Sequence, residues 1–410
     1  MRLIIHRGTD QIGGSCVEFV TSTTRIIVDI GLPLDSKARN DEDLWKYMPS
    51  IEGKIDAVLI SHYHMDHHGL LPILDETVPV YASEGTISMF GINVVFINQK
   101  PIKNLIKIES NKEITIGDIR ITPYTVDHSA FDAMAFLIES EGKRILYSGD
   151  IRIHGVKARL YKLLPKEVDY LILEGTNIGK ENYSADTEDQ IMGRFTDVFK
   201  SSNDAINYVW CSGQNIDRLV SIYRACLQSS KFLVVDPYVA NVLYEVHAIR
   251  STIPSLSSHD NLYVYYPNKL STKISNMGYN DYLYRLMPKK YKLTYEILSA
   301  NPEKFVMIVR PSVLEFISMI EAPKGNFINS MYQLYETYDE NRALINWVKE
   351  KGYTYHHIHT SGHATLQELK TITAEVNPKY IIPIHTENKN TYANHFDNII
   401  VLNDNQPFTL

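Results

Sequence analysis

The sequence predicts an α/β protein in which a two-sheet sandwich is interrupted by an inserted domain. Short β-rich runs separated by turn residues fill residues 1 to 178, and strands alternate with amphipathic helices over residues 179 to 350. A further helix and strand follow in residues 351 to 410, where we expect the sandwich to resume. The length of 410 residues also favours two domains, or one domain enlarged by an insertion.

The first predicted strands are short runs rich in β-branched and aromatic residues. In chain order they are RLIIHRG, SCVEFVTS, TRIIVDIG, DAVLISH, VPVYAS, IRITPYTVDH, AMAFLIESE and KRILYSGD. Because these strands come with few long helices between them, we expect two sheets packed face to face, flanked by helices.

The inserted region shows a different periodicity. DTEDQIMGRFTDVFK and NIDRLVSIYRACLQ have the pattern of amphipathic helices, whereas AINYVWCS and KFLVVDP have that of strands. Near the end of the sequence, Thr365 and Glu368 fit a capping box that opens a helix, and KYIIPIHTE gives one more strand.

Composition favours a cytoplasmic protein that does not contact a membrane. The three cysteines, Cys16, Cys211 and Cys226, are scattered, which indicates reduced thiols. The first residues lack a secretory apolar core, and no apolar stretch approaches the roughly 18 residues of a spanning helix. Since the net charge is −7, binding of nucleic acid would depend on local positive charge or on metal ions. The sequence leaves open whether the chain forms a homo-oligomer.

The stretch LISHYHMDHHGL contains the pattern H-x-H-x-D-H, formed by His62, His64, Asp66 and His67. Side chains at i and i+2 of an extended strand end point the same way, so His62 and His64 can hold one metal ion. The following turn directs Asp66 and His67 toward a second site. Imidazole and carboxylate ligands without thiolate favour zinc, with manganese or iron as alternatives. His68 lies outside the pattern, and we interpret it as a supporting residue or a bystander.

Three further candidate ligands stand where predicted strands end. They are His128 in TVDHSA, Asp150 in YSGD and His385 in IPIHTE. Sheet scaffolds present functional groups at such positions. Each residue alone would suit a structural role, but together with H-x-H-x-D-H they indicate a metal site.

At this point the residues resemble the metallo-β-lactamase superfamily, whose fold is a four-layer αββα sandwich with a metal site at one edge. The stretches IGGS and IIVDIG, with Asp29 and Gly31, add to the resemblance. By this resemblance, one zinc ion is held by His62, His64 and His128, the other is held by Asp66, His67 and His385, and Asp150 bridges the two. His64 sets the chain apart from the diiron flavoprotein reductases of the superfamily, which carry a glutamate there.

Three more stretches resemble the β-CASP subgroup of nucleases, and ribonuclease J in particular. LILEGTNIG places Glu174 at that subgroup's first added motif, HTSGHA places His363 at the second, and His385 stands at the third. In this subgroup a histidine at the third motif accompanies RNA specificity. CSGQNIDRL resembles a helix start used near the RNA backbone, and helix N-termini bind anions. The substrate contacts expected from these stretches are Ser212, Asn215, Arg218, His359, Ser361 and Gly362.

Two features depart from ribonuclease J. The chain has Glu174-Gly175-Thr176-Asn177 where ribonuclease J carries an Asp-Ser-Thr-Asn-like motif, and we expect it to lack the additional C-terminal domain of that family. The stretch YYPNKLSTKISNMGYNDYLYRLMPKKYKL contains interleaved aromatic and basic residues, which fit either an RNA contact or a solvated surface.

The sequence therefore predicts a two-zinc hydrolase that cleaves RNA phosphodiester bonds, with internal and 5′-terminal cleavage both open. The metal ions would supply a hydroxide near neutral pH, and Asp66 would orient it. His363 would protonate the leaving oxygen, with Glu174 holding its imidazole. One alternative is a small-molecule lactonase or thioesterase of the superfamily, which needs neither a large inserted domain nor the Glu174 and His363 pair. Another is a binding module with an inactive site, against which the complete set of ligands counts.

Overall fold

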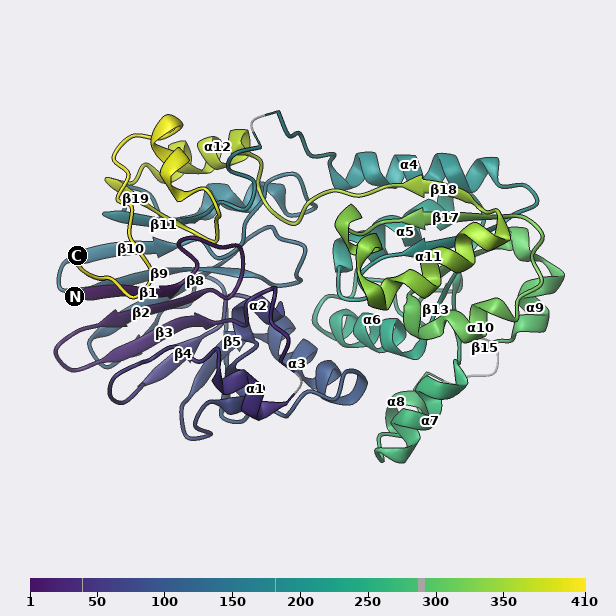
Figure 1. Ribbon diagram of the computed structural model, residues 1–410, viewed down its shortest axis with the longest axis horizontal. Coiled ribbons are helices and arrows are strands. Elements are labelled where there is room, and N and C mark those ends of the chain that lie inside the picture. Colours follow the sequence, from purple (N-terminus) through teal and green to yellow (C-terminus); the bar gives the residue numbers. More distant parts are fainter. Residues whose placement is uncertain (39, 181, 287–291) are drawn as a thin grey trace. The chain divides into compact units, whose positions relative to one another are not determined.

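The computed structural model divides into two compact units (Figure 1). It describes residues 1–38, 40–180, 182–286 and 292–410. The sandwich unit comprises Met1–Gly91, Gln99–Ala185 and Gly362–Leu410. The parallel-sheet unit comprises Ile92–Asn98 and Asp186–Ser361.

Two sheets form the sandwich unit. The first has the order β20-β1-β2-β3-β4-β5-β6, and the second has the order β19-β11-β10-β9-β8-β7. The first sheet contains β1 (Arg2–Arg7), β2 (Cys16–Val20), β3 (Arg25–Ile30), β4 (Ala57–Leu59), β5 (Val80–Ser83), β6 (Leu105–Ile108) and β20 (Pro407–Thr409). The second contains β7 (Ile114–Ile116), β8 (Ile119–Thr125), β9 (Met134–Ser140), β10 (Lys143–Tyr147), β11 (Tyr170–Glu174) and β19 (Tyr380–Ile384). Each sheet is antiparallel on one side and parallel on the other.

The core of the sandwich unit lies between these sheets. Phe19 and Val28 of the first sheet belong to one buried cluster with Phe136 and Ile172 of the second. Burying a side chain of this size contributes about 1.5–3 kcal/mol. In β8, buried Ile119 and Ile121 alternate with more exposed residues, as expected for a strand with one face toward a core. The structure thus confirms the predicted two-sheet sandwich.

Helices and short 3₁₀ turns connect these strands. They are α1 (Asp41–Trp45), α2 (Met65–His68), α3 (Glu84–Phe96), α12 (Leu366–Val376), η1 (Leu71–Ile73), η2 (Ala158–Leu163) and η7 (Lys389–Asn394). The predicted capping box at the start of α12 is present, because the Thr365 side chain accepts from the Glu368 backbone and the Glu368 side chain accepts from the Thr365 backbone.

The parallel-sheet unit has one seven-stranded sheet in the order β15-β14-β13-β16-β12-β17-β18, with every pair parallel. Its strands are β12 (Ile206–Trp210), β13 (Phe232–Val235), β14 (Leu262–Tyr265), β15 (Lys292–Leu293), β16 (Phe305–Val309), β17 (Gly325–Asn329) and β18 (Thr354–His357). Its helices are α4 (Glu188–Ser201), α5 (Ile216–Gln228), α6 (Pro237–Ile249), α7 (Asn268–Asn276), α8 (Asp281–Tyr284), α9 (Tyr295–Ala300), α10 (Leu314–Ser318), α11 (Asp339–Lys351), η4 (Pro302–Lys304), η5 (Pro311–Val313) and η6 (Gln333–Thr337). Parallel strands need crossover connections, and helices supply them here.

The units divide at different residues from those expected. The boundary falls after Ala185 instead of residue 178, and after Ser361 instead of residue 350. The second shift arises because β18 pairs with β17 and so completes the parallel sheet. The last part of α3 and the residues after it, Ile92–Asn98, also group with the parallel-sheet unit, although sequence analysis placed them in the sandwich.

Composition also led to predictions about the cysteines and about membrane-spanning helices. Cys16, Cys211 and Cys226 form no disulfide among the described residues, and all three are buried. Among the described residues, no helix combines the length and apolar character required to span a membrane.

Candidate metal centre and active site

Seven histidine and aspartate side chains of the sandwich unit meet where its strands end. His62 follows β4, and His64, Asp66 and His67 lie at and within α2 immediately after it. The remaining three follow β8, β10 and β19 and are His128, Asp150 and His385. The structure therefore brings together every ligand that sequence analysis named.

The first set of donor atoms surrounds His64. Its Nδ1 lies 3.1 Å from His62 Nε2 and 3.2 Å from His128 Nε2. Asp150 Oδ2 lies 3.7 Å from His62 Nε2 and 3.8 Å from His128 Nε2. Four donors thus converge from one strand end, one helix cap and two loops.

The second set is centred on His67. Its Nε2 lies 3.2 Å from Asp150 Oδ2 and 3.8 Å from Asp66 Oδ2. His385 Nε2 lies 3.3 Å from Asp66 Oδ2. Because Asp150 Oδ2 is close to both sets, one carboxylate oxygen can serve two adjacent metal sites.

These donors fit metal ions on two grounds. Zinc binds imidazole nitrogen at about 2.0–2.1 Å, so tetrahedral ligands stand about 3.4 Å apart, close to the observed separations. In addition, His67 Nε2 and Asp150 Oδ1 are buried and have no hydrogen-bond partner within the described residues. Orphaned buried polar atoms are costly unless an ion or water satisfies them. The cluster is therefore able to hold metal.

Hydrogen bonds orient the imidazoles from behind. His67 Nδ1 donates to Asp29 Oδ2 at 2.7 Å, and Asp29 also accepts from the Ser61 and Tyr147 hydroxyls at 2.8 Å each. His128 Nδ1 donates to the Gly362 carbonyl at 2.6 Å. With Nδ1 used in this way, the Nε2 atoms of these rings face the cluster as possible ligands.

The backbone is strained or tightly packed at three of these positions. Asp29 and His385 have φ values of 58° and 53°, in the left-handed region that side chains with a Cβ rarely adopt. A Cβ on Gly31 would lie 1.8 Å from the Asp66 carbonyl oxygen, so only glycine allows α2 to approach β3 this closely.

The charges in the cluster shift one another's pKa values. Burial raises the pKa of the Asp150 carboxyl, but the neighbouring His385, His67 and His363 outweigh burial and hold it well below its ordinary value. Burial lowers the pKa of His67, and the carboxylates of Asp150 and Asp29 nevertheless raise it well above its ordinary value.

His363 stands at the edge of the cluster, with a side chain 21% exposed. Its Nδ1 lies 3.5 Å from Glu174 Oε1 and 3.8 Å from Asp150 Oδ2. Burial lowers the pKa of His363, but the nearby carboxylates of Asp150 and Glu174 more than offset this and raise it to about 9. A protonated imidazole beside the cluster is suited to proton donation.

The turn after β11 holds the loop that carries His363. The Thr176 hydroxyl lies 3.1 Å from His363 Nδ1, and the Thr176 amide donates to Glu174 Oε2 at 2.9 Å. The Asn177 amide group donates to the carbonyl oxygens of His363 and Ala364 at 3.3 and 3.1 Å. The departure from the ribonuclease J motif also has a local reason, because a Cβ on Gly175 would lie 1.9 Å from the Tyr392 hydroxyl.

Comparison with known proteins assigns a family to this arrangement. Residues 24–202 match the beta-lactamase superfamily domain, and residues 352–399 match a Zn-dependent metallo-hydrolase RNA specificity domain. These matches identify residues 24–202 as a beta-lactamase superfamily domain. The chain is also similar to ribonuclease J-like metallo-hydrolases, as the sequence predicted.

Two relatives illustrate the similarity of this metallo-β-lactamase-fold chain to known proteins. An RNase J-like protein of Methanocaldococcus jannaschii is 26% identical over 364 residues, which cover 81% of this chain and 77% of the relative. Ribonuclease J of Helicobacter pylori is 24% identical over 400 residues, which cover 93% of this chain and 55% of the relative. The chain therefore spans only about half the length of that ribonuclease J.

A solved structure supports the fold. A protein of unknown function from Enterococcus faecalis V583 matches with a TM-score of 0.80 at 21% identity, covering 100% of this chain and 99% of that one. At this identity the similarity concerns the metallo-β-lactamase-type architecture alone.

The expected substrate contacts divide between the units. Gly362 belongs to the sandwich unit and presents its carbonyl oxygen to His128. The other five, Ser212, Asn215, Arg218, His359 and Ser361, belong to the parallel-sheet unit. The Asn215 side chain caps α5 by accepting from the Arg218 amide at 3.0 Å.

Arg218 does not suit the role expected of it. Its side chain is fully buried, with Glu188 oxygens 3.3 and 3.4 Å from its guanidinium nitrogens and a further bond to the Ser330 hydroxyl. The guanidinium therefore has no exposed surface for a phosphate, and we interpret Arg218 as a structural residue. The sequence pattern shows that this arginine begins a helix but not which face of the helix is buried.

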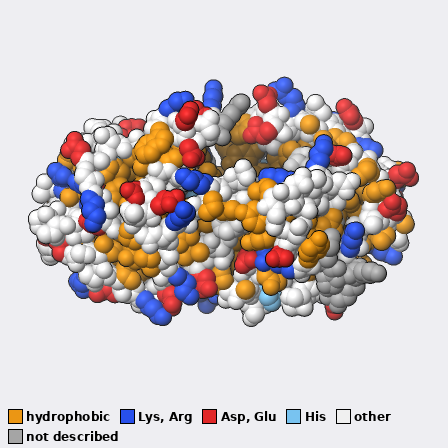
Figure 2. Space-filling model, turned by 90° about the horizontal axis from the view of Figure 1, so that it is seen from below, with side chains coloured by type: hydrophobic (Ala, Val, Ile, Leu, Met, Phe, Trp, Pro, Cys, Tyr) orange, Lys and Arg blue, Asp and Glu red, His pale blue; other side chains and the backbone are white. Residues whose placement is uncertain are grey.

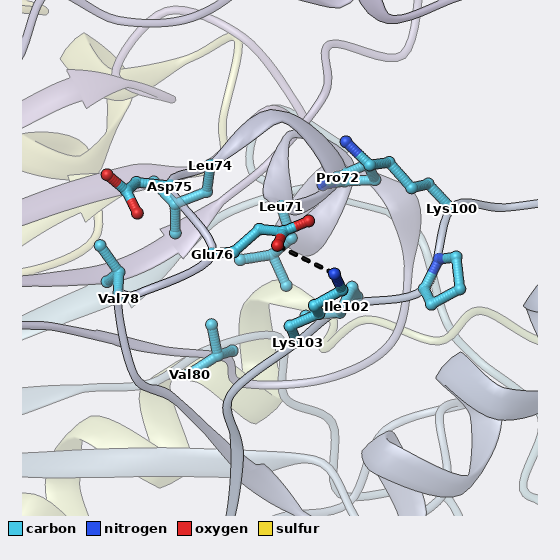
Figure 3. A pocket seen from close by; sticks show the side chains of 11 residues that line it. Leu71, Pro72, Leu74, Asp75, Glu76, Val78, Val80, Lys100, Ile102 and Lys103 are labelled. Atoms are coloured by element: carbon cyan, nitrogen blue, oxygen red, sulfur yellow. Dashed lines mark hydrogen bonds and ion pairs between the residues drawn. The ribbon is translucent and has the colours of Figure 1, made fainter.

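A small cavity elsewhere in the sandwich unit involves none of these residues. It lies between η1 and the segment Lys100–Lys103, has a volume of about 20 Å³, and contains the 2.9 Å ion pair of Lys103 with Glu76 (Figure 3). A volume of this size accommodates little more than one water molecule. The histidine cluster therefore remains the candidate active site.

Proposed function

We propose that this chain is a metal-dependent ribonuclease that hydrolyses RNA phosphodiester bonds. The observation that carries the proposal is the position of His363 beside the Glu174 carboxylate, at the edge of a cluster able to hold two metal ions. The match of residues 352–399, which include His363 and His385, to an RNA specificity domain supports RNA as the substrate. The relatives named ribonuclease J support the same reaction class.

We assign the metal ligands as the sequence and the superfamily suggest. One zinc ion would be held by His62, His64 and His128, the other by Asp66, His67 and His385, with Asp150 between them. Manganese is an alternative for the same donors. When bound, such ions lower the pKa of water toward neutrality and polarise the phosphoryl oxygens.

The residues of the chain supply the rest of the reaction. The Asp66 carboxylate, at the opening of α2, orients the attacking water by accepting a hydrogen bond from it. The water first releases a proton to solvent; as the resulting hydroxide oxygen bonds to phosphorus, the bond from phosphorus to the 3′-oxygen breaks, and His363 gives that oxygen a proton. Glu174 keeps the imidazole oriented and favours its protonated form. The products are a 5′-phosphate and a 3′-hydroxyl.

A panel of substrates tests the proposal. Zinc-loaded protein is incubated with a 5′-monophosphorylated RNA, a DNA of the same sequence, a lactone and a thioester. We expect RNA to be cleaved in clear preference to DNA, because His385 occupies the position that accompanies RNA specificity in the β-CASP subgroup. Hydrolysis of the lactone or thioester without cleavage of RNA would instead identify a small-molecule hydrolase.

A further inference from the structure

Residues 151–166 form a positively charged segment directly after the candidate ligand Asp150. Five basic residues and no acidic residue occur in this stretch, although the whole chain carries a net charge of −7. On the face shown in Figure 2, basic side chains (blue) and acidic side chains (red) are interspersed. A concentration of one sign within 16 residues is therefore a local property of this segment.

Two of the five basic residues are neutralised by the fold. Arg152 is fully buried, and its Nε lies 3.3 Å from Asp127 Oδ1. Lys166 lies 2.5 Å from Glu375. The other three, Lys157, Arg159 and Lys162, have no carboxylate within ion-pair distance in the part of the chain that the structure describes. Arg159 and Lys162 are exposed, and Lys157 is half-buried.

The segment is attached to the metal cluster by hydrogen bonds. The Arg152 amide donates to the Asp127 carbonyl at 2.8 Å, and the Ala364 amide donates to the Ile151 carbonyl at 2.8 Å. These bonds join it to the neighbours of His128 and His363. Lys157 Nζ also donates to the carbonyl oxygen of His128 at 3.5 Å. Lys157, whose charge also acts on the Asp132 carboxyl, is thus carried with Arg159 and Lys162 by a segment anchored at both sides of the site.

We propose that Lys157, Arg159 and Lys162 bind backbone phosphates of the RNA strand whose scissile bond occupies the metal cluster. This inference rests on the proposed function and names the part of the sandwich unit that positions the polymer. Cationic side chains attract the phosphates of any sequence and fix the register of the strand without reading bases. Because the net charge of the chain is negative, this local charge supplies an attraction that the whole molecule does not.

Charge reversal tests the segment against a matched control. The test variant is Arg159→Glu with Lys162→Glu, and the control is Lys54→Glu with Lys143→Glu. Lys54 precedes β4 and Lys143 opens β10, at the opposite strand ends from His62 and Asp150. Both variants change the net charge equally. Metal content is measured first, and binding of a phosphorothioate-linked uridine oligonucleotide is then followed by fluorescence anisotropy at several salt concentrations.

We expect the test variant to bind the oligonucleotide at least about tenfold more weakly than wild type, with the control within about twofold of wild type. Loss of two phosphate contacts should reduce the slope of log Kd against log salt by about 1.4 for a single strand. Equal weakening in both variants, or an unchanged slope in the test variant, would overturn the inference. Wild-type protein that binds no RNA at any salt concentration would instead remove the proposed function.

A second inference follows independently from Thr176. Its hydroxyl lies 3.1 Å from His363 Nδ1 and 2.9 Å from His385 Nδ1, and the two rings stand 5.4 Å apart at an interplanar angle of 21°. With Nε2 of His385 assigned to metal, its Nδ1 would carry the proton and donate to the Thr176 hydroxyl. One hydroxyl therefore contacts both the candidate acid and a candidate ligand.

We infer that Thr176 is a positioning residue that holds His363 with Nε2 directed to the leaving oxygen. Thr176 and Glu174 both contact Nδ1 and so fix the rotation of the ring, which sets the direction of Nε2. A valine at this position keeps the shape and removes the hydroxyl, whereas a serine keeps the hydroxyl. The pair of variants therefore separates hydrogen bonding from packing.

The test compares Thr176→Val and Thr176→Ser with wild type. For Thr176→Val we expect unchanged metal content, a KM for RNA within about twofold, a kcat reduced about 10 to 100-fold, and a rotated His363 ring in a crystal structure. Thr176→Ser should restore kcat and ring orientation. Loss of metal in Thr176→Val, an unrotated ring, or equal impairment of the serine variant would overturn the inference. The ring orientation is read without RNA, so this outcome is separate from the proposed substrate.

Discussion

The carboxylate of Glu174 lies 3.5 Å from the Nδ1 of His363, at the end of a strand whose every residue is buried. The pair joins the last residue of β11 to a loop nearly two hundred positions later in the chain. Because the Glu174 side chain is almost completely buried and His363 is partly exposed, the carboxylate holds the ring from the interior side.

Replacement of His363 by alanine should therefore remove proton donation and leave the metal site intact. We expect metal content near that of wild type and RNA turnover reduced by about 10² to 10⁴-fold, the usual contribution of general acid catalysis. The loss should be smaller for a nitrophenyl phosphodiester, whose leaving group needs no proton. Glu174→Gln should show a milder form of the same pattern. Equal slowing of both substrates would indicate that His363 positions the phosphate instead.

Replacement of Asp29 by asparagine should weaken metal binding without removing a ligand. The asparagine keeps the size of the side chain but replaces the carboxylate that orients His67 and accepts from Ser61 and Tyr147. Loss of such a supporting carboxylate typically lowers metal affinity by about 10 to 100-fold. Competition with a chelator, followed by elemental analysis, measures the change. An unaltered metal affinity would show that His67 is not a ligand or is held by other contacts.

The sequence located four candidate ligands by their local spacing and three by their positions at strand ends, but it did not show which groups support them. His62, His64, Asp66 and His67 lie within six positions and around one strand end. The contacts of Asp29 with Tyr147 and of Thr176 with His385 join residues far apart in the chain, and no periodicity encodes such pairs. The stretches IIVDIG and EGTN contain Asp29 and Thr176, but the sequence did not predict the contacts that these two residues make.

Two other differences have physical reasons. The expected boundary near residue 350 follows the end of a helix, whereas the sheet of the parallel-sheet unit is completed only by β18. The sequence predicted that Arg218 contacts the substrate, because it lies at the start of a helix and helix N-termini bind anions. Its burial depends on Glu188, which lies 30 positions earlier and compensates the charge.

Replacement of Arg218 by methionine should destabilise the parallel-sheet unit. The substitution leaves the buried Glu188 carboxylate without its partner, which typically costs about 3–5 kcal/mol. The double variant with Glu188→Gln should recover part of this loss because the uncompensated charge is gone. Urea unfolding monitored by circular dichroism measures both effects. A stable Arg218→Met variant with weakened RNA binding would support the phosphate contact expected from the sequence.

Acid should destabilise the same unit through His359. Burial, followed by repulsion from Arg218, lowers the pKa of His359 to about 3, against about 6.5 in an unfolded chain. Between these values the unfolded chain binds a proton that the folded chain does not, so stability rises with pH. The contribution is at most about 1.4 kcal/mol per pH unit and ends above the unfolded pKa.

The variant His359→Asn should flatten this part of the pH profile. Urea unfolding of both proteins is measured at several pH values between 4 and 7, and the free energy of unfolding is plotted against pH. The slopes of the two proteins should differ by no more than the value for one proton. Parallel profiles for the two proteins would show that His359 is protonated as easily in the folded chain as in the unfolded one.

The most direct test of the account measures bound metal and RNA cleavage on the same samples. Purified protein is stripped of metal, titrated with zinc, and analysed for ions per chain and for the rate of RNA hydrolysis. We expect activity to rise with occupancy to two ions per chain, and Asp150→Ala to fail in both measurements because the shared carboxylate is missing. RNA cleavage that is independent of bound metal, or metal-loaded protein that never cleaves RNA, would contradict the central claim.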